Sequence, residues 1–297
     1  MNKGRILTLA TLLVSPLATL NAADSKPLRT RAPVQKGADE TGVTPRSKGE
    51  PTNAKEAADK KGAATAAIDA KYAELVAKLP PEEQAWERTL QANLGGFYLP
   101  LYKAGRVKGS EQAWDYVRDV PGLPRVLLIG DSVSRGYTLA ARKALSGKAN
   151  VHRAPENCGP SANGLKKLDV WLAGEKWDVL HFNFGIHDRA TPPDVYRQRL
   201  ETLVTRMKAT GAKVIWASTT PVPPDTKDGP KASGAIVERN RIAAEVMARH
   251  GVAINDLFAF ITLHLSRVQN PKDVHFKGEG YDLLGKQVAE AIAAALK

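Results

Sequence analysis

Apolar residues recur in short runs between polar and glycine-rich segments over the C-terminal part of the chain. Five stretches bounded by turn residues can form strands, and they span 125–129, 150–154, 177–184, 213–218 and 252–255. The first is mostly apolar, as in a buried parallel strand. Helical periodicity fills the intervals and the end of the chain, over 138–145, 165–172, 195–209, 235–250, 258–268 and 280–297. Strands that alternate with helices predict an α/β fold with a parallel five-stranded sheet covered on both faces.

The start of the chain has the pattern of a secretory signal peptide. Lys3 and Arg5 precede an apolar run over 6–20, and small residues follow at 21–23. The run is about 15 residues, shorter than the roughly 20 that a membrane-spanning helix needs. We therefore expect residues 1–23 to be removed near Ala22 or Ala23. The mature protein would be exported, periplasmic or secreted, without an integral membrane span.

Three further parts follow the predicted signal peptide. Residues 24–65 are rich in Ala, Lys, Pro, Gly and Thr without apolar periodicity, which predicts a flexible low-complexity linker. Residues 66–120 show two helical patterns and an aromatic segment, and we interpret them as a helical N-terminal extension. Residues 121–297 hold the alternating strands and helices and form the main domain.

The composition is that of a globular protein, with 43% hydrophobic and 25% charged residues. The net charge of +12 is unevenly distributed, because residues 1–71 carry 12 of the 43 basic and only 7 of the 31 acidic residues. No block of five or six like charges and no RNA-binding or zinc-finger motif is present, so we expect no nucleic-acid partner. The single cysteine, Cys158, excludes an intramolecular disulfide.

Candidate reactive residues gather where the predicted strands end, because ligands collect at the carboxyl ends of parallel strands. Ser132 follows the first strand, at a helix N-terminus that favours developing negative charge. A serine nucleophile needs a base, and His275, with Asp273 two positions earlier, is the candidate. The three have the chain order Ser, Asp, His of one type of catalytic triad. The alternative for Ser132 is a helix cap.

Four motifs resemble the sequence blocks of the SGNH/GDSL hydrolase superfamily, in the same order. They are Gly130-Asp131-Ser132 with Ser134 and Gly136, 157–161, 185–188 and 273–275. The Gly-x-Ser-x-Gly pattern of a lipase-type nucleophile elbow is absent at Ser132. One such motif would be weak evidence, whereas four in order indicate an exported, bacterial-type esterase of this superfamily.

The resemblance implies a three-layer α/β/α flavodoxin-like sandwich and ester hydrolysis without a metal or another cofactor. It implies that Ser132 is the nucleophile, His275 the general base and then the general acid, and Asp273 the orienting carboxylate. The oxyanion hole would consist of the N–H groups of Ser132 and Gly159 and the side chain of His187.

Two positions depart from the pattern of the superfamily. His187 stands where the superfamily has Asn, and an imidazole can donate the required hydrogen bond only in one tautomer. Lys272 stands three residues before His275, where the superfamily has the catalytic Asp, and Asp273 is one position later. Asp256 and Asp282 are the alternatives for the acid.

Other residues with chemical potential have less specific interpretations. His181, His187 and Asp188 are residue types that bind zinc or iron, but His181 lies inside a predicted buried strand, so we expect no metal site. Cys158 is expected to be a small filler residue. The aromatic side chains of Trp216, Tyr98 and Tyr102 are candidates for stacking on a sugar, with core packing as the alternative.

Export and the resemblance together predict a serine esterase that removes short acyl groups, chiefly O-acetyl, from a carbohydrate. The substrate would be an acylated small molecule or polysaccharide. The alternatives are a lipid or thioester acyl hydrolase with the same triad, and a non-catalytic carbohydrate-binding or envelope module with a degenerate site. The sequence defines no oligomeric state.

Overall fold

The computed structural model describes residues 52–226 and 229–297, so the predicted signal peptide and most of the predicted linker lie outside the described residues. The strands are β1 (Arg125–Ile129), β2 (Asn150–Arg153), β3 (Val179–Phe182), β4 (Lys213–Ala217) and β5 (Ala253–Asn255). The helices are α1 (Thr52–Ala77), α2 (Pro81–Asn93), α3 (Gly95–Val107), α4 (Ser132–Ala144), α5 (Ser161–Leu172), η1 (Ile186–Asp188), α6 (Pro193–Ala209), α7 (Gly229–His250), α8 (Leu257–Thr262), α9 (Leu265–Val268) and α10 (Gly278–Leu296).

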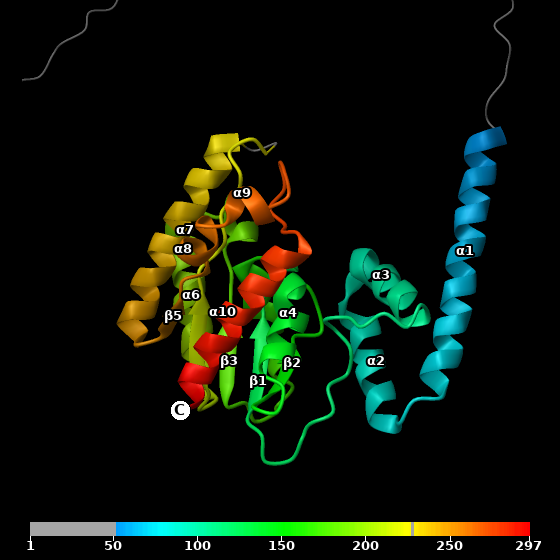
Figure 1. The fold of residues 1–297 in the computed structure, drawn as a ribbon, viewed down its shortest axis with the longest axis horizontal. Helices are drawn as coiled ribbons and strands as arrows, with labels where there is room; N and C mark the ends of the chain where they lie inside the picture. The colour runs from blue at the N-terminus through cyan, green and yellow to red at the C-terminus, as the bar shows by residue number, and fades with distance from the viewer. Residues whose placement is uncertain (1–51, 227–228) are drawn as a thin grey trace, which may run out of the picture. The chain divides into compact units, whose positions relative to one another are not determined.

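The five strands form one parallel sheet in the order β2-β1-β3-β4-β5 (Figure 1). The chain passes from β1 to β2 on one side and then crosses to β3 on the other side of β1. Ligands of open parallel sheets bind at the carboxyl edge where the strand order reverses in this way. The predicted α/β fold with a five-stranded parallel sheet is confirmed, and β1 and β3 define the edge where a site is expected.

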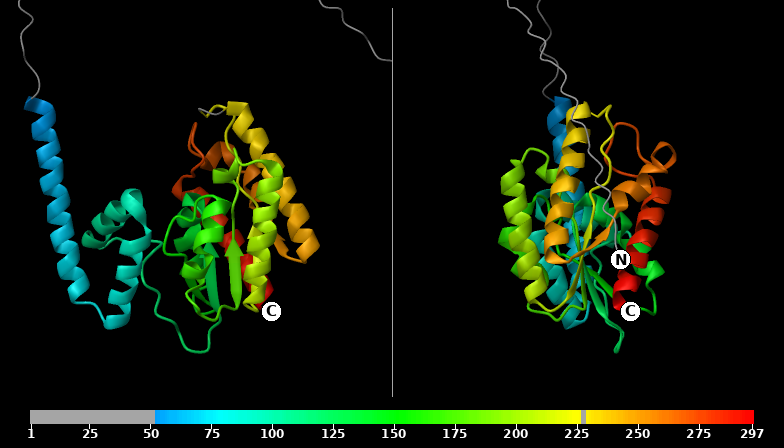
Figure 2. Two further views of the ribbon diagram at one scale, coloured as in Figure 1. Left: turned by 180° about the vertical axis from the view of Figure 1, so that it is seen from behind. Right: turned by 90° about the vertical axis from the view of Figure 1, so that its left-hand side faces the viewer.

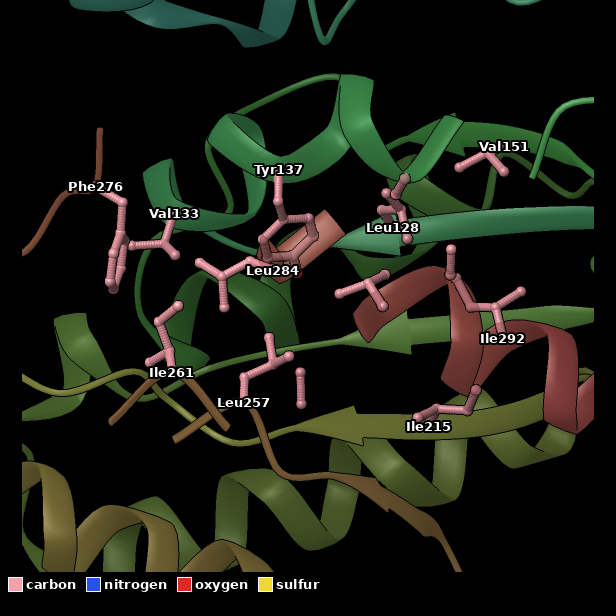
Figure 3. Close-up of a cluster of buried hydrophobic side chains, with 14 of the residues drawn as sticks. Leu128, Val133, Tyr137, Val151, Ile215, Leu257, Ile261, Phe276, Leu284 and Ile292 are labelled. Atoms are coloured by element: carbon pink, nitrogen blue, oxygen red, sulfur yellow. The ribbon is translucent and has the colours of Figure 1, made fainter. Parts of the chain in front are cut away.

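Each face of the sheet has its own hydrophobic core, because successive strand side chains point to opposite faces. Val126 and Leu128 of β1 belong to the core beneath α4 and α10, whereas Leu127 and Ile129 belong to the core beneath α5, α6 and α7. Figure 3 shows Leu128 among side chains from α4, α8 and α10. The carboxyl end of β1 is thereby fixed between two layers of helices (Figure 2).

Helices α1, α2 and α3 precede the sheet and pack around one buried carboxylate. Tyr72 of α1 and Tyr102 of α3 donate hydrogen bonds to the two oxygens of Glu87 in α2, at 2.6 and 2.9 Å. The Nε atom of Arg106 lies 3.2 Å from Glu87. Burial, together with the nearby carboxylate, raises the pKa of both tyrosines, so they remain protonated donors.

Helix α1 begins at Thr52, earlier than the sequence pattern predicts, so residues 52–65 of the expected linker are helical. Residues 58–67 are exposed on all sides, in agreement with their lack of apolar periodicity. Ala and Lys, which are abundant there, have high helix propensity and form helices without burying a face. In the part of the chain that the structure describes, no helix has the length and apolar character required to cross a membrane.

Trp114 connects this helical extension to the main domain. Its indole N–H donates to the carbonyl of Ala154, just after β2, at 3.1 Å. Trp86 of α2 donates to the carbonyl of Trp114 at 2.7 Å, and Arg142 of α4 donates to the carbonyl of Ala113 at 2.9 Å. The loop that carries Trp114 is therefore fixed from both sides.

Candidate active site

Ser132 lies at the junction of β1 and α4, and its hydroxyl does not cap the helix. The capping role falls to Asp131, whose Oδ1 accepts a hydrogen bond from the Val133 N–H at 2.9 Å. Gly130 precedes it in a position where a Cβ atom would lie only 2.7 Å from the Ser134 Oγ. This close approach explains the Gly-Asp-Ser order, which leaves the Ser132 hydroxyl available.

His275 connects Ser132 to Asp273. Its Nε2 lies 2.8 Å from the Ser132 Oγ, and its Nδ1 lies 2.7 Å from the Asp273 Oδ1. With the proton on Nδ1, the ring donates to Asp273 and accepts the hydroxyl hydrogen of Ser132. The side chains of His275 and Asp273 are 36% and 44% exposed, so this chain of hydrogen bonds opens to solvent.

A tight turn lets Asp273 reach the imidazole from two residues away. The Asn270 N–H donates to the His275 carbonyl at 3.0 Å, and Gln269 forms an antiparallel bridge with Phe276. Lys272 has a φ of 55°, a left-handed conformation that is uncommon for a residue with a side chain. Partial burial acts to raise the pKa of Asp273, but hydrogen bonds from His275 outweigh it and hold the pKa below its usual value.

The two alternative acids lie elsewhere. Asp256 caps α8, and its Oδ1 accepts from Ser218 Oγ at 2.7 Å and from the Ala259 N–H at 3.0 Å. Asp282 lies on α10. Of the three candidates, Asp273 is the one that the structure brings to His275.

The loop that carries Gly159 is held beside the end of β1, because the Cys158 N–H donates to the Gly130 carbonyl at 3.1 Å. Gly159 has a φ of 63°, which a side chain would strain. Within residues 52–226 and 229–297, the N–H groups of Ser132 and Gly159 donate to no protein acceptor. His187 lies exposed on η1, without a hydrogen bond to the Ser132–His275 pair. Its role as a third donor stays a prediction.

Asp188 is a site residue whose role sequence reasoning missed. Its buried carboxylate accepts from the Ser161 N–H at 2.8 Å and from the Ser161 hydroxyl at 2.6 Å. It therefore ties η1 to the loop that carries Gly159. The sequence signal was present, because Asp188 ends the third motif, but the motif alone does not reveal which loop its carboxylate binds.

Asn183 and Arg153 were also missed. Asn183, just after β3, donates to the Ala217 carbonyl at 2.7 Å and to Thr219 Oγ1 at 3.0 Å, which joins the ends of β3 and β4. Arg153 ends β2, and its buried guanidinium donates to the Gly130 and Asp131 carbonyls. A charged residue at the end of a predicted buried strand was the available signal for Arg153.

The candidate sugar-stacking residues are corrected in part. Trp216 is only 1% exposed because β4 directs it into the core beneath α5, α6 and α7. Tyr102, also 1% exposed, points inward to Glu87. Neither ring can stack on a substrate. Tyr98 is partly exposed, packs edge-on against Trp114 and lies beneath the Arg135 guanidinium.

Cys158 and His181 are buried near the site, in surroundings that keep both side chains uncharged. Burial raises the pKa of the Cys158 thiol to about 12, which keeps it protonated and unreactive. His181 is fully buried in β3 and bonds Asn255 through Nε2 at 3.2 Å, and burial lowers its pKa to about 4. Among the described residues, no group of three or more His, Cys, Asp or Glu side chains is arranged to hold a metal ion.

Comparisons with solved structures agree with this architecture. A lipase/acylhydrolase from Enterococcus faecalis superposes with a TM-score of 0.50 at 24% identity, covering 58% of this chain and 96% of its own. The acetyl xylan esterase AlAXEase has a TM-score of 0.50 at 13% identity, with coverages of 57% and 99%. The acetylxylan esterase Axe2 from Geobacillus stearothermophilus has a TM-score of 0.50 at 14% identity, with coverages of 57% and 94%. At these identities the likeness establishes the fold.

Sequence comparisons establish the family. A comparison with curated protein sequences found no match. The model of the GDSL-like lipase/acylhydrolase family matches residues 128–283, more than half of the chain and the segment that carries Ser132, Asp273 and His275. The chain therefore belongs to the GDSL-like lipase/acylhydrolase family, a family of serine ester hydrolases within the SGNH/GDSL superfamily.

Proposed function

We propose that the protein is an exported serine esterase that removes short acyl groups, chiefly O-acetyl, from a carbohydrate. The observation that carries the proposal is the hydrogen-bonded chain from Asp273 through His275 to Ser132, with distances of 2.7 and 2.8 Å. A serine with a base within hydrogen-bond reach, and a third group that orients the base, is the arrangement required for nucleophilic acyl transfer.

The geometry supports a two-step reaction. The Ser132 Oγ attacks the acyl carbonyl carbon while its proton passes to His275 Nε2, and the carbonyl oxygen becomes an oxyanion. His275 then returns this proton to the departing sugar oxygen as the ester C–O bond breaks, which leaves an acyl-serine. Water attacks the acyl-serine in the same way and releases the carboxylic acid. Asp273 holds the ring in the required tautomer and stabilises its charged form.

The oxyanion would accept hydrogen bonds from the N–H groups of Ser132 and Gly159, which have no other protein acceptor in the described residues. Losing one such donor raises the barrier by about 2.7 to 4 kcal/mol in other hydrolases. His187 would supply the third donor, and His187→Ala is expected to lower kcat by about tenfold or more. Full activity of this variant, measured on the same ester as the wild type, would remove His187 from the oxyanion hole.

One comparison supports a short acyl group. The structural neighbours of this chain include two acetylxylan esterases, AlAXEase and Axe2. Carbohydrate substrates are also consistent with a protein that works outside the cytoplasm.

The central experiment compares p-nitrophenyl acetate, p-nitrophenyl esters of longer chains and acetylated xylan as substrates of the mature protein. Turnover that favours acetate and is abolished by Ser132→Ala is expected. A preference for long chains would favour the lipid or thioester hydrolase instead. Absence of turnover on every ester would favour the binding module with a degenerate site.

Export is supported by the charged, apolar and small-residue pattern of residues 1–23. The measurement is N-terminal sequencing of the protein recovered from the periplasm or medium of a bacterial host. A chain that begins at Ala23 or Asp24 is expected. A chain that stays in the cytoplasm with residues 1–23 attached would contradict export without affecting the esterase proposal.

A further inference from the structure

The Arg153 guanidinium is buried behind the nucleophile, and within residues 52–226 and 229–297 it forms no ion pair with a carboxylate. Its side chain is 1% exposed, and the acceptors that it reaches in the described residues are all uncharged oxygens. It donates to the Gly130 carbonyl at 3.0 Å, the Asp131 carbonyl at 2.9 Å and the Ser134 hydroxyl at 2.6 Å. Removing an ion from water costs several kcal/mol, so a buried cation with neutral partners adds little to the stability of a fold.

The position of the bonded carbonyls gives this cation a chemical consequence. The Asp131 carbonyl and the Ser132 N–H belong to the same peptide unit. A hydrogen bond from a cation to the carbonyl oxygen draws electron density from the amide nitrogen, which strengthens the N–H as a donor. Ser134 Oγ donates to the same carbonyl at 3.0 Å and adds to this polarisation. Charge on the guanidinium thus acts on the N–H through one peptide group.

The helical extension covers the guanidinium. The Trp114 ring lies 5.6 Å from the Arg153 guanidinium carbon and is itself 3% exposed. The indole N–H holds the Ala154 carbonyl, the residue after Arg153, which fixes the ring over this end of β2. A guanidinium kept from water polarises its neighbours more strongly, because the local dielectric constant is low.

We propose that Arg153 is a positioning residue for the oxyanion hole. It polarises and orients the Ser132 N–H. Trp114 excludes water from the Arg153 guanidinium, and it lies outside the matched family segment of residues 128–283. The inference rests on the proposed esterase mechanism, in which this N–H stabilises the tetrahedral intermediate.

Arg142 offers a matched control. It is a partly buried arginine next to β2, and it donates to the carbonyls of Val151 at 2.9 Å and Ala113 at 2.9 Å, away from Ser132. Arg153→Met and Arg142→Met remove comparable cations and comparable carbonyl hydrogen bonds. Both should lower the melting temperature. Arg142→Met also frees the Ala113 carbonyl beside Trp114, so it should lower kcat no more than Trp114→Ala does, whereas Arg153→Met should lower kcat further.

The kinetic test measures kcat and KM on the ester that the wild type hydrolyses best. Arg153→Met is expected to lower kcat by about tenfold or more, below the roughly 10²- to 10³-fold loss for a missing donor, with KM within about threefold. Affinity for a boronic acid that forms a tetrahedral adduct with Ser132 should fall in parallel with kcat/KM. Arg153→Lys, which keeps the charge, should retain part of the activity and serves if Arg153→Met fails to fold.

Trp114→Ala tests whether the Trp114 ring must cover the Arg153 guanidinium. It is expected to lower kcat severalfold, with Arg153 in place, while Trp114→Phe keeps the ring and most of the rate. Equal kcat losses in the Arg142 and Arg153 variants, or an Arg153→Met variant within twofold of the wild-type kcat, would overturn the inference.

Nuclear magnetic resonance separates this inference from the proposed function, because it needs no substrate. The Ser132 amide proton should move upfield in Arg153→Met and Arg153→Lys and should move less in Arg142→Met, which leaves the Arg153 hydrogen bonds in place. An unmoved resonance would reject the polarisation of the N–H even in an active esterase. A moved resonance in a protein that hydrolyses no ester would reject the proposed function and leave the polarisation standing.

Discussion

The left-handed backbone of Lys272 is what brings Asp273 to His275. A catalytic acid only two residues before its histidine must turn back sharply, and the 270–276 turn provides this with a φ of 55° at Lys272. Such a conformation costs about 1 to 3 kcal/mol for a residue other than glycine, so the surrounding turn must impose it. The strained backbone of Lys272 is therefore needed to place Asp273 next to His275.

Substitutions at Lys272 test this dependence. Lys272→Pro fixes φ near −65°, which is incompatible with the turn, and we expect kcat to fall by at least about tenfold. Lys272→Gly accepts the positive φ and should keep kcat within about twofold of the wild type. Ester hydrolysis by both variants is measured after circular dichroism has shown equal folded content. A fully active proline variant would mean that Asp273 does not need this turn.

The identity of the acid is tested by a pair of Asp→Asn variants. Asp273→Asn removes the charge that stabilises the His275 imidazolium and should lower kcat by about 10² to 10⁴. Asp256→Asn is the matched control, because an asparagine can still cap α8 and Asp256 bonds Ser218 instead of His275. Steady-state rates on the same ester compare the variants. A large loss for Asp256→Asn alone would reassign the acid.

At the scale of secondary structure, the central strand β3 carries a histidine that is buried as a neutral group. His181 contacts Asn255 of β5 and the ring of Tyr137 in α4, and burial lowers its pKa from 6.5 to about 4. In the unfolded chain the same ring binds a proton near pH 6.5. Between these two pH values the unfolded state holds more protons, so stability is lost as pH falls from about 6.5 to about 4.

This linkage predicts a pH-dependent free energy of unfolding. Between pH 7 and pH 4.5, His181 should account for a loss of about 2 to 3 kcal/mol in the wild type, at 1.36 kcal/mol for each pKa unit. His181→Gln should show a smaller loss over the same range. Urea denaturation of both proteins at the two pH values provides the measurement. Identical losses would show that another group titrates.

The elements themselves were largely predictable from the sequence. Short stretches bounded by turn residues located the strands to within a few residues. The signal was clearest for β1, because residues 126–129 of this strand are apolar and buried on both faces of the sheet. Helix starts were less accurate: α4 begins at Ser132, six positions before the predicted helix, since Asp131 caps it through a polar segment. Polar capping residues carry no hydrophobic periodicity.

The site was predictable where a motif names its chemistry and not where packing decides. The motifs identified Ser132, Asp273 and His275 as candidates, and the structure brings these side chains together. Trp216 and Tyr102 were proposed for substrate contact, yet both are buried. An aromatic ring can pack in a core or stack on a sugar, and the sequence does not show which helices cover it.

Across the whole molecule, the extension and the main domain depend on different buried contacts. The sheet domain rests on two large apolar cores, whereas α1, α2 and α3 share one smaller apolar cluster around the Glu87 carboxylate. Breaking a buried charge cluster leaves its partners without compensation, which typically costs about 3 to 5 kcal/mol. Loss of Glu87 is therefore expected to weaken the extension more than the sheet domain.

Glu87→Ala is expected to loosen the extension. It leaves Tyr72, Tyr102 and Arg106 without their buried partner, so residues 52–120 should become susceptible to trypsin while the sheet domain remains protected. Glu83→Ala is the control, since it removes only a surface ion pair with Arg118, which contributes little to stability because solvent screens it. Limited proteolysis with mass spectrometry reports the cut sites. Equal cleavage of the two variants would assign Glu87 no special role.

The rate at which the buried Cys158 thiol is alkylated can report how often its loop opens, without any engineered label. As the single cysteine, next to Gly159 and with a pKa of about 12, it can be alkylated only when this loop opens. Labelling by iodoacetamide should therefore be slow and should slow further when a phosphonate occupies Ser132. Rapid labelling that the phosphonate leaves unchanged would indicate a loop that opens independently of the site.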